Sequence, residues 1–344
     1  MKTHVVTPQT LEQNDDGYLL VKAEPGDTVR FEPGTYLIKN VNGFRTKLSG
    51  TASRRIRFEA ATRYGALINT VGPAKGKGFA WENFGSFVDI EGFDITSTQG
   101  SCRIGILNRG ANVRIVGNHV HGIVCTDDHN GGAGIDHTGS DCETVGNLIH
   151  DVKFVGDTPN VILHGIYYAA PRGRVWNNIC FDVRDYGIHL YHLPVTDIVV
   201  ANNLVFRARH GMYVGTGSDT QAADFCLVSN TIIRDVSGFG IVQGGGGSVG
   251  SHNYYLRNLF KDCGSGPFSN GFMGLVPDID MQELVGIDPK FVDYKPDGTG
   301  NYSLAADSPC RDAGTWAGAP PVDFENKSRP SGKRCDIGPY EFQS

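Results

Sequence analysis

Residues 113–123 read VRIVGNHVHGI, a short apolar strand pattern that ends in Asn118 and is followed at once by a second one. The same pattern returns along the chain, and its asparagines are separated by 29, 31, 25, 27 and 28 residues. These asparagines are Asn118, Asn147, Asn178, Asn203, Asn230 and Asn258. Self-similarity at a period of this length indicates a repeat architecture.

A third short strand, built on glycine followed by an apolar residue, lies between successive copies. The pairs are Gly105-Ile106, Gly134-Ile135, Gly165-Ile166, Gly187-Ile188, Gly211-Met212 and Gly240-Ile241. Three strands per repeat describe one turn of a three-sided parallel β-helix, in which each turn buries its apolar face by stacking on the next. A WD-type propeller needs four strands per roughly 40–45 residues, so the shorter period excludes it.

The asparagine column has a physical reason in such a stack. Identical amides at a sharp bend can bond to one another and to the backbone along the axis. Asparagine also tolerates the left-handed backbone conformation that a bend requires. We therefore expect an asparagine ladder along one corner of the solenoid.

Composition and charge narrow the class of protein. The chain has 46 glycines in 344 residues and only 20% charged residues, which disfavours a helical bundle. A net charge of −6 gives no sign of a nucleic-acid partner, although a local basic cleft could still bind a polyanion. The sequence contains no run of 18 apolar residues, so it predicts no membrane-spanning helix.

The start of the chain and its cysteines leave alternatives open. Residues 1–17 contain no apolar signal core, so we expect a secreted or periplasmic protein whose leader has been removed, or a phage-borne or cytoplasmic one. The eight cysteines fit no CxxC metal pattern. Cys310 and Cys335 could form a disulfide or remain buried thiols. The sequence predicts no oligomeric state.

Two longer stretches resemble known β-helix proteins. PGDTVRFEPGTYLI and RRIRFEAATRYGALI, near the start, resemble the opening of the alginate lyase and chondroitin lyase family. The tail, with NYSLAADSPCRDAG and RPSGKRCDIGPYEF, is similar to the end of many secreted bacterial β-helix proteins. The resemblance implies an all-β, single-domain, right-handed parallel β-helix that acts on a polysaccharide. We expect about nine or ten turns over residues 1–285, N-terminal cap included, and a non-repeat tail over 286–344 packed on the helix.

One polar column is expected on the outer surface. Alternate residues of a strand point to opposite faces, so if the apolar residue after each glycine points inward, the next points outward. That column reads Leu107, Asp136, Tyr167, His189, Tyr213 and Val242. Its four polar members would extend about 15 Å at the usual strand spacing, which suits two or three sugar units. The long connections at 125–132 and 154–161 would form walls beside it.

Histidine and tyrosine are suited to proton transfer. For β-elimination of a uronate, His189 would be the base and Tyr213 the acid, with Tyr167 able to exchange roles with Tyr213 and Asp136 next to them in the column. The candidate substrate-binding residues around these strands are Arg184, His164, His210, Tyr191, His192, Lys153 and Arg209. An arginine among them could pair with the substrate's carboxylate. The mixture is closest in type to alginate epimerases and to lyases that use tyrosine and histidine.

Three other interpretations remain open. A glycoside hydrolase needs two carboxylates, and Asp136 could work with Asp127, Asp128 or Asp185. A metal could be held by Asp127, Asp128 and His137, with calcium favoured by carboxylates and zinc by histidine. A non-catalytic carbohydrate-binding, phage or adhesin protein could use the tyrosines for stacking alone.

The resemblance also bears on cofactors. The resembling lyases use a Lys/Arg pair with calcium held by one Asn and two Glu on successive turns. Asp136, Tyr167 and His189 occupy the corresponding column here, so the calcium cradle is not visible. We expect no required cofactor, with calcium as an option, and an anionic polysaccharide as the partner.

Overall fold

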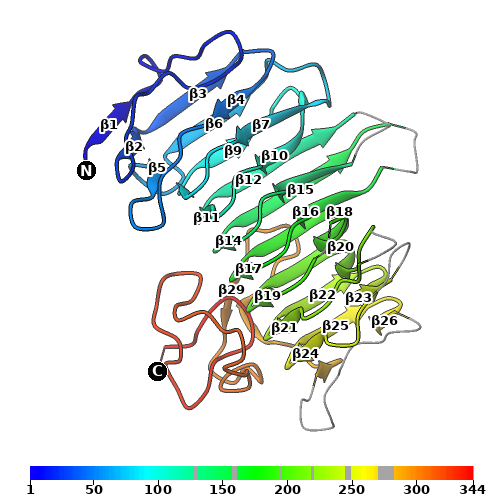
Figure 1. The fold of residues 1–344 in the computed structure, drawn as a ribbon. Helices are drawn as coiled ribbons and strands as arrows, with labels where there is room; N and C mark the ends of the chain where they lie inside the picture. The colour runs from blue at the N-terminus through cyan, green and yellow to red at the C-terminus, as the bar shows by residue number, and fades with distance from the viewer. Residues whose placement is uncertain are drawn as a thin grey trace. The chain divides into compact units, whose positions relative to one another are not determined.

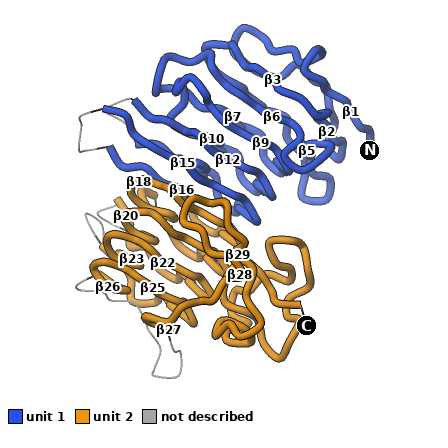
Figure 2. The backbone as a smooth tube through the Cα atoms, turned by 180° about the vertical axis from the view of Figure 1, so that it is seen from behind, with its two compact units in different colours: residues 1–167 blue, residues 168–344 orange. Residues whose placement is uncertain are grey.

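The protein is described by a computed structural model that covers residues 1–126, 131–156, 161–193, 195–217, 221–244, 249–269 and 283–343. It forms two compact units, residues 1–167 and 168–344, shown in Figure 2. Each unit is a parallel β-solenoid, and together they contribute about nine turns. The described residues contain no α-helix. The predicted all-β parallel β-helix is therefore confirmed.

The first unit has three strips of parallel strands, one for each side of the turn (Figure 1). The first strip consists of β1 (Thr3–Val6), β2 (Thr28–Phe31), β5 (Ile56–Ala60), β8 (Val88–Glu91), β11 (Arg114–Val116) and β14 (Cys142–Val145). The second consists of β3 (Gly34–Ile38), β6 (Ala66–Thr70), β9 (Asp94–Thr96), β12 (His119–Cys125) and β15 (Leu148–Phe154). The third consists of β4 (Phe44–Thr46), β7 (Gly78–Asn83), β10 (Cys102–Asn108), β13 (Gly132–His137) and β16 (Leu163–Tyr168).

The second unit also has three strips of parallel strands, but two of its strands are long enough to pass through a corner and belong to two strips. These long strands are β18 (Ile179–Leu190) and β20 (Leu204–Val214). The first strip consists of β17 (Gly173–Trp176), β19 (Ile198–Ala201), β21 (Leu227–Ser229) and β24 (Tyr254–Leu256). The other sides are completed by β22 (Ile232–Val236), β23 (Phe239–Gln243), β25 (Leu259–Cys263), β26 (Gly266–Phe268) and β27 (Leu284–Val285).

The asparagine ladder is present at the corner after the first strip. In the first unit, Asn147 Oδ1 accepts bonds from the backbone N–H and the side-chain amide of Asn118, at 2.9 and 3.1 Å. Asn118 in turn accepts from Phe93 N–H at 2.9 Å and donates to the Ile90 carbonyl at 2.9 Å. In the second unit, Asn203 does the same for Asn178. Each side chain therefore satisfies buried backbone groups on the neighbouring turn.

Two details of the predicted ladder are wrong. Thr231, not Asn230, occupies the ladder position between Asn203 and Asn258. The left-handed conformation belongs to the residue before each ladder position, including Gly117, Asn177, Asn202 and Asn230. The bend thus needs two adjacent residues with different tasks, one that tolerates positive φ and one that supplies the amide.

The glycine column is explained by lack of space. A Cβ at Gly211 would lie 2.4 Å from Ile233 Cγ2 and 2.5 Å from the carbonyl oxygen of Gly240 on the next turn. A Cβ at Gly134 would lie 2.4 Å from Ile149 Cγ2. The turns approach so closely here that any side chain would push them apart. The apolar residue after each glycine is fully buried, as predicted.

The chain after β27 packs against strands of the second unit. It contains one antiparallel pair, β28 (Phe291–Asp293) and β29 (Asn301–Leu304). Asn202 donates to the carbonyls of Asp336 and Gly338, and Asn230 donates to Thr315. The expected division at residue 286 would lie inside this second unit and stays a prediction.

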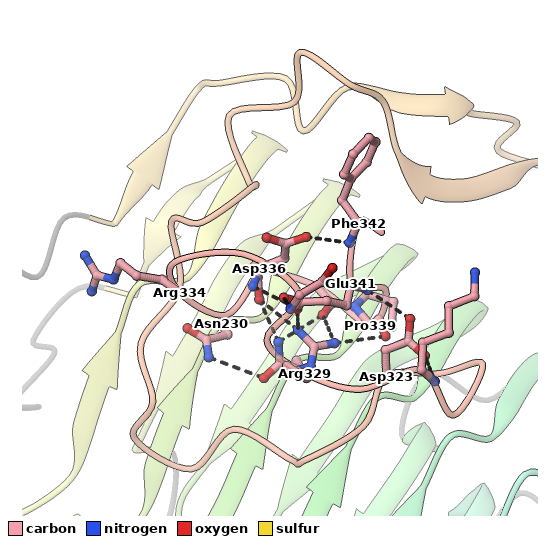
Figure 3. Close-up of polar contacts among 12 residues, drawn as sticks. Asn230, Asp323, Arg329, Arg334, Asp336, Pro339, Glu341 and Phe342 are labelled. Carbon is pink, nitrogen blue, oxygen red and sulfur yellow. Dashed lines mark hydrogen bonds and ion pairs between the residues drawn. The ribbon is translucent and has the colours of Figure 1, made fainter. Parts of the chain in front are cut away.

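A buried ion pair organises the end of the chain, as Figure 3 shows. Arg329 lies 3.0 Å from Glu341, and its guanidinium also donates to the carbonyls of Asp336, Gly338 and Pro339. Buried charges of this kind need several partners to offset their lost hydration. Cys310 and Cys335, in the same region, are free thiols. No described helix is long and apolar enough to cross a membrane.

The ladder can be tested with Asn118→Ala. The change strands the Phe93 N–H and the Ile90 carbonyl without partners, at about 1–3 kcal/mol each. We expect a loss of roughly 3 kcal/mol in the free energy of unfolding, measured by urea denaturation. The matched control is Asn69→Ala, since Asn69 bonds only to exposed Thr98 among the residues described, and it should cost less than about 1 kcal/mol. Equal losses in both variants would contradict the ladder's role.

Candidate functional site

His189 and Tyr213 lie side by side in the second unit. They are paired in register on β18 and β20, and their ring centroids are 4.6 Å apart with nearly perpendicular planes. The register follows from the glycine column, which aligns Ile188 with Met212 one position earlier. Two residues 24 positions apart in the sequence are thereby held on one face of adjacent turns.

Further aromatic rings surround this pair. Tyr191 stacks on His189 at 5.2 Å and meets Tyr213 edge-on at 5.6 Å. Tyr186 lies 4.8 Å from His189 and 5.3 Å from Tyr213. His210 stacks on Tyr186 at 5.2 Å. We call these residues, with His192 beside Tyr191 at 4.9 Å, the His189 cluster.

The cluster is more enclosed than the sequence predicted. His189 and Tyr213 are 5% and 6% exposed, and Asp136 and Tyr167 in the first unit are 9% and 8% exposed. The sequence predicted that this column faces solvent, but its four polar side chains are largely buried. Neighbouring rings cover His189, Tyr213 and Tyr167, and strand alternation alone does not predict such packing.

Burial also sets the protonation of the cluster. It raises the pKa of Tyr213 to about 12, with Tyr191 and Tyr186 adding to the effect. It lowers the pKa of His192 and of His210. His210 also accepts a hydrogen bond from Phe239 N–H at 2.9 Å. At neutral pH Tyr213 is a protonated phenol, as tyrosine ordinarily is, and burial makes its proton harder to release.

Two predicted arginines lie beside the cluster and share one carboxylate. Asp185 is 3.8 Å from Arg184 and 3.9 Å from Arg209. The Arg209 side chain is 65% exposed, whereas Asp185 is nearly buried. Arg209 is accordingly open to an anion from solution.

The other predicted residues belong to the first unit. Tyr167 stacks on His164 at 4.7 Å, and Asp136 is paired in register with Leu107. Lys153, on β15, pairs with Asp151. Their joint action with His189 stays a prediction. Asp127 and Asp128 lie outside the described residues.

The metal-ligand prediction for His137 is wrong. This side chain points into the solenoid, where Nδ1 meets the Asn108 amide at 3.1 Å and Nε2 meets the Thr144 hydroxyl at 2.7 Å. Burial lowers its pKa to about 3. His137 continues an interior polar row with Asn83 and Asn108, so both ring nitrogens are already engaged.

Asp136 is an unusual carboxyl group. Burial raises its pKa to about 7, against the opposing effect of Arg103 and Arg109. Its Oδ1 has no hydrogen-bond partner among the residues that the structure describes. A carboxylic acid that keeps its proton near neutral pH can serve as a general acid.

Sequence reasoning missed Tyr186, Asp185 as a partner of both arginines, and Glu82. Tyr186 was hidden because a bulge shifts the register between Val183 and Tyr186. Glu82 precedes Leu107 in the same column, but it is held between Arg45 and Arg109 at 2.8 Å each. We assign Glu82 a structural role.

Comparison with known proteins identifies the fold. No protein-family model and no curated protein matches the chain. Among solved structures, pectate lyase Pel9A is similar with a TM-score of 0.64 at 16% identity, covering 99% of this chain and 96% of that one. The chain has the parallel β-helix fold of polysaccharide lyases.

Two alginate lyases agree with this result. The enzyme from Paenibacillus sp. str. FPU-7 has a TM-score of 0.52 at 15% identity, over 79% of this chain and 99% of that one. The PL6 family enzyme AlyGC has a TM-score of 0.50 at 13% identity, over 82% of this chain and 42% of that one. At such identities the likeness shows the fold alone.

The raised pKa of Asp136 predicts a pH-dependent stability. The unfolded carboxyl loses its proton near pH 4 and the folded one near pH 7, so the folded state loses stability as pH rises between these values. A difference of about three pKa units corresponds to on the order of 4 kcal/mol. The measurement is the free energy of unfolding of Asp136→Asn minus that of the wild type, from urea denaturation. This difference should be several kcal/mol more favourable to the variant at pH 8 than at pH 4.5.

The control is Asp293→Asn, which alters a half-exposed carboxylate paired with Lys295. Its stability relative to wild type should change little between the two pH values. An Asp136→Asn difference that is the same at pH 4.5 and pH 8 would contradict the raised pKa.

Proposed function

We propose that the protein is a polysaccharide lyase that acts on a uronate-containing polymer by proton abstraction and β-elimination, or a C5-epimerase that begins with the same step. The observation that carries the proposal is the His189–Tyr213 pair, in register and 4.6 Å apart. The lyase structures of the same fold support the substrate class. An anionic polymer of this kind would be met outside the cytoplasm, in agreement with the expected secreted or periplasmic location.

In this mechanism His189 is the base and Tyr213 the acid. An imidazole nitrogen of His189 takes the C5 proton, and the electron pair of the C5–H bond forms the C4–C5 double bond. The C4–O glycosidic bond breaks, and the Tyr213 hydroxyl protonates the leaving oxygen. The assignment of Tyr213 as the acid rests on its position beside His189, in register on the next turn. Proton exchange with solvent then restores both groups.

Carboxylate recognition is assigned to Arg209, with Arg184 in support. Neutralising the uronate carboxylate makes the C5 proton more acidic, which is a requirement of β-elimination. Tyr191, His192 and His210 would line the sugar-binding surface, and stacking on Tyr191 suits a pyranose ring. Tyr167, His164 and Lys153 are proposed as sugar-binding residues of the first unit.

A glycoside hydrolase is the second candidate, favoured by one observation. The pKa of about 7 at Asp136 suits a general acid. The partner carboxylate would be Asp127 or Asp128. Product analysis separates the candidates, because a lyase gives ultraviolet absorbance from the new double bond, a hydrolase gives reducing ends without it, and a binding protein gives neither.

The central test is a set of variants assayed on pectate, alginate and glycosaminoglycan uronates. His189→Ala should lower the rate of absorbance increase by about 10²-fold or more, and Tyr213→Phe should act similarly, since each removes a proton-transfer group. The matched control is His252→Ala, another imidazole of the second unit paired with a carboxylate, Asp224, at 2.7 Å. Near-normal turnover of a folded His189→Ala variant would eliminate this mechanism.

Arg209→Ala tests carboxylate recognition separately. Loss of a charge-assisted hydrogen bond of about 1.5–3 kcal/mol should raise KM by roughly tenfold or more. Steady-state kinetics would measure KM and kcat apart. Arg174→Ala, which removes an exposed arginine from β17, should leave KM unchanged. If both variants behave alike, Arg209 does not bind the substrate's carboxylate.

A further inference from the structure

Three histidines gather on the outer face of the second strip of the first unit. His119 and His121 lie on β12, and His150 lies on β15. His121 is paired in register with His150, and His119 with Asp94 on β9. One ligand atom from each histidine lies within 4.8 Å of the other two. The strand register therefore brings three imidazoles from two adjacent turns together.

The side chains face one another rather than solvent alone. His119 Nε2 and His150 Nε2 are 2.8 Å apart. The His119 and His121 rings stack at 4.3 Å, and the His121 and His150 rings stack at 5.4 Å. The three side chains are 18–28% exposed, so they remain in contact with solvent.

Carboxylates hold the outer nitrogens of two of these rings. His119 Nδ1 lies 3.2 Å from Asp94, and His150 Nδ1 lies 2.8 Å from Asp151. A carboxylate on one ring nitrogen fixes the tautomer, so that the other nitrogen presents its lone pair, and this arrangement is typical of histidines that bind metals. With a metal ion bound, it would direct both Nε2 lone pairs toward the same point.

Two Nε2 atoms at 2.8 Å that both present lone pairs would repel each other. Without a metal ion, one ring must be protonated or change its tautomer so that its Nε2–H donates to the other ring; a metal cation between the two nitrogens also removes the repulsion. A tetrahedral ion with Zn–N bonds of about 2.0–2.1 Å holds its nitrogens about 3.3 Å apart, so the rings would need to separate by only about half an ångström. In His121 the Asp94 carboxylate lies 2.9 Å from Nε2, so by the same rule Nδ1 is the nitrogen left to supply a third bond.

We propose that His119, His121 and His150 bind one divalent transition-metal ion of the zinc class. Three imidazoles suit zinc, cobalt or nickel rather than calcium or magnesium. Asp94 and Asp151 are positioning residues, and their two negative charges balance the ion. The site differs from the His189 cluster in residues and in chemistry, so it does not depend on the proposed function.

The ion would join neighbouring turns of the solenoid through side chains. Its ligands come from β12 and β15, and the positioning carboxylate Asp94 comes from β9. Binding to the folded state alone raises apparent stability. The expected consequence is a metal-dependent melting temperature of the whole protein.

The experiment uses the full chain after chelator treatment. Zn²⁺ is titrated by calorimetry, and Co²⁺ by visible absorption, which reports coordination number. We expect one ion per chain, the intense bands of four-coordinate Co²⁺, and a higher melting temperature with Zn²⁺. His121→Ala and His150→Ala should each abolish the Co²⁺ bands. Asp151→Asn keeps the three ligands and should weaken binding about 10–100-fold.

His252→Ala is the control, since it removes a histidine that is paired with a carboxylate but lies elsewhere. It should bind Zn²⁺ as the wild type does. Asp151→Asn guards against misfolding, because asparagine tolerates the positive φ of that position. Absence of stoichiometric binding, or binding that survives both His121→Ala and His150→Ala, would overturn the proposal.

Discussion

The register of one turn on the next is the constraint on which this structure depends. Strands about 4.8 Å apart repeat the same positions from turn to turn, so a slip of one residue would exchange the inner and outer faces. Two columns hold the register: buried amides such as Asn118 and Asn147 bond across the gap, and glycines such as Gly211 allow close approach. The amide ladder opposes slipping because a displaced turn would leave buried backbone groups without partners.

The same register creates both chemical features of the surface. It sets His189 beside Tyr213 on adjacent turns of the second unit. In the first unit it sets His121 beside His150, with His119 beside Asp94. Residues far apart in sequence thus become neighbours without any loop to position them. A scaffold of this kind holds reacting groups rigidly, which lowers the entropic cost of bringing them together.

The sequence predicted the features that every turn must repeat. The glycine and asparagine columns could be recognised because the stacking requirement is the same at each turn. Exceptions such as Thr231 could not, since a hydroxyl replaces the amide there without changing the backbone path. His137 was misassigned because its neighbours in sequence are polar, whereas the strand directs it into the interior row with Asn108.

Enclosure of the site could not be predicted from alternation. The alternation of residues along a strand gives the direction of His189 and Tyr213 but not which residues cover them. Tyr186 packs on both rings, and a bulge between Val183 and Tyr186 shifts its register so that alternation does not predict this. The histidine group on β12 and β15 was recognised as strand but not as a group, because its members meet only through the pairing of two turns.

The most direct measurement is a crystal structure of the Tyr213→Phe variant with a bound uronate oligosaccharide. The account predicts a uronate ring stacked on Tyr191, with its C5 carbon next to a His189 ring nitrogen and its carboxylate on Arg209. An oligosaccharide bound on another face of the solenoid, with His189 still covered by its neighbours, would contradict it.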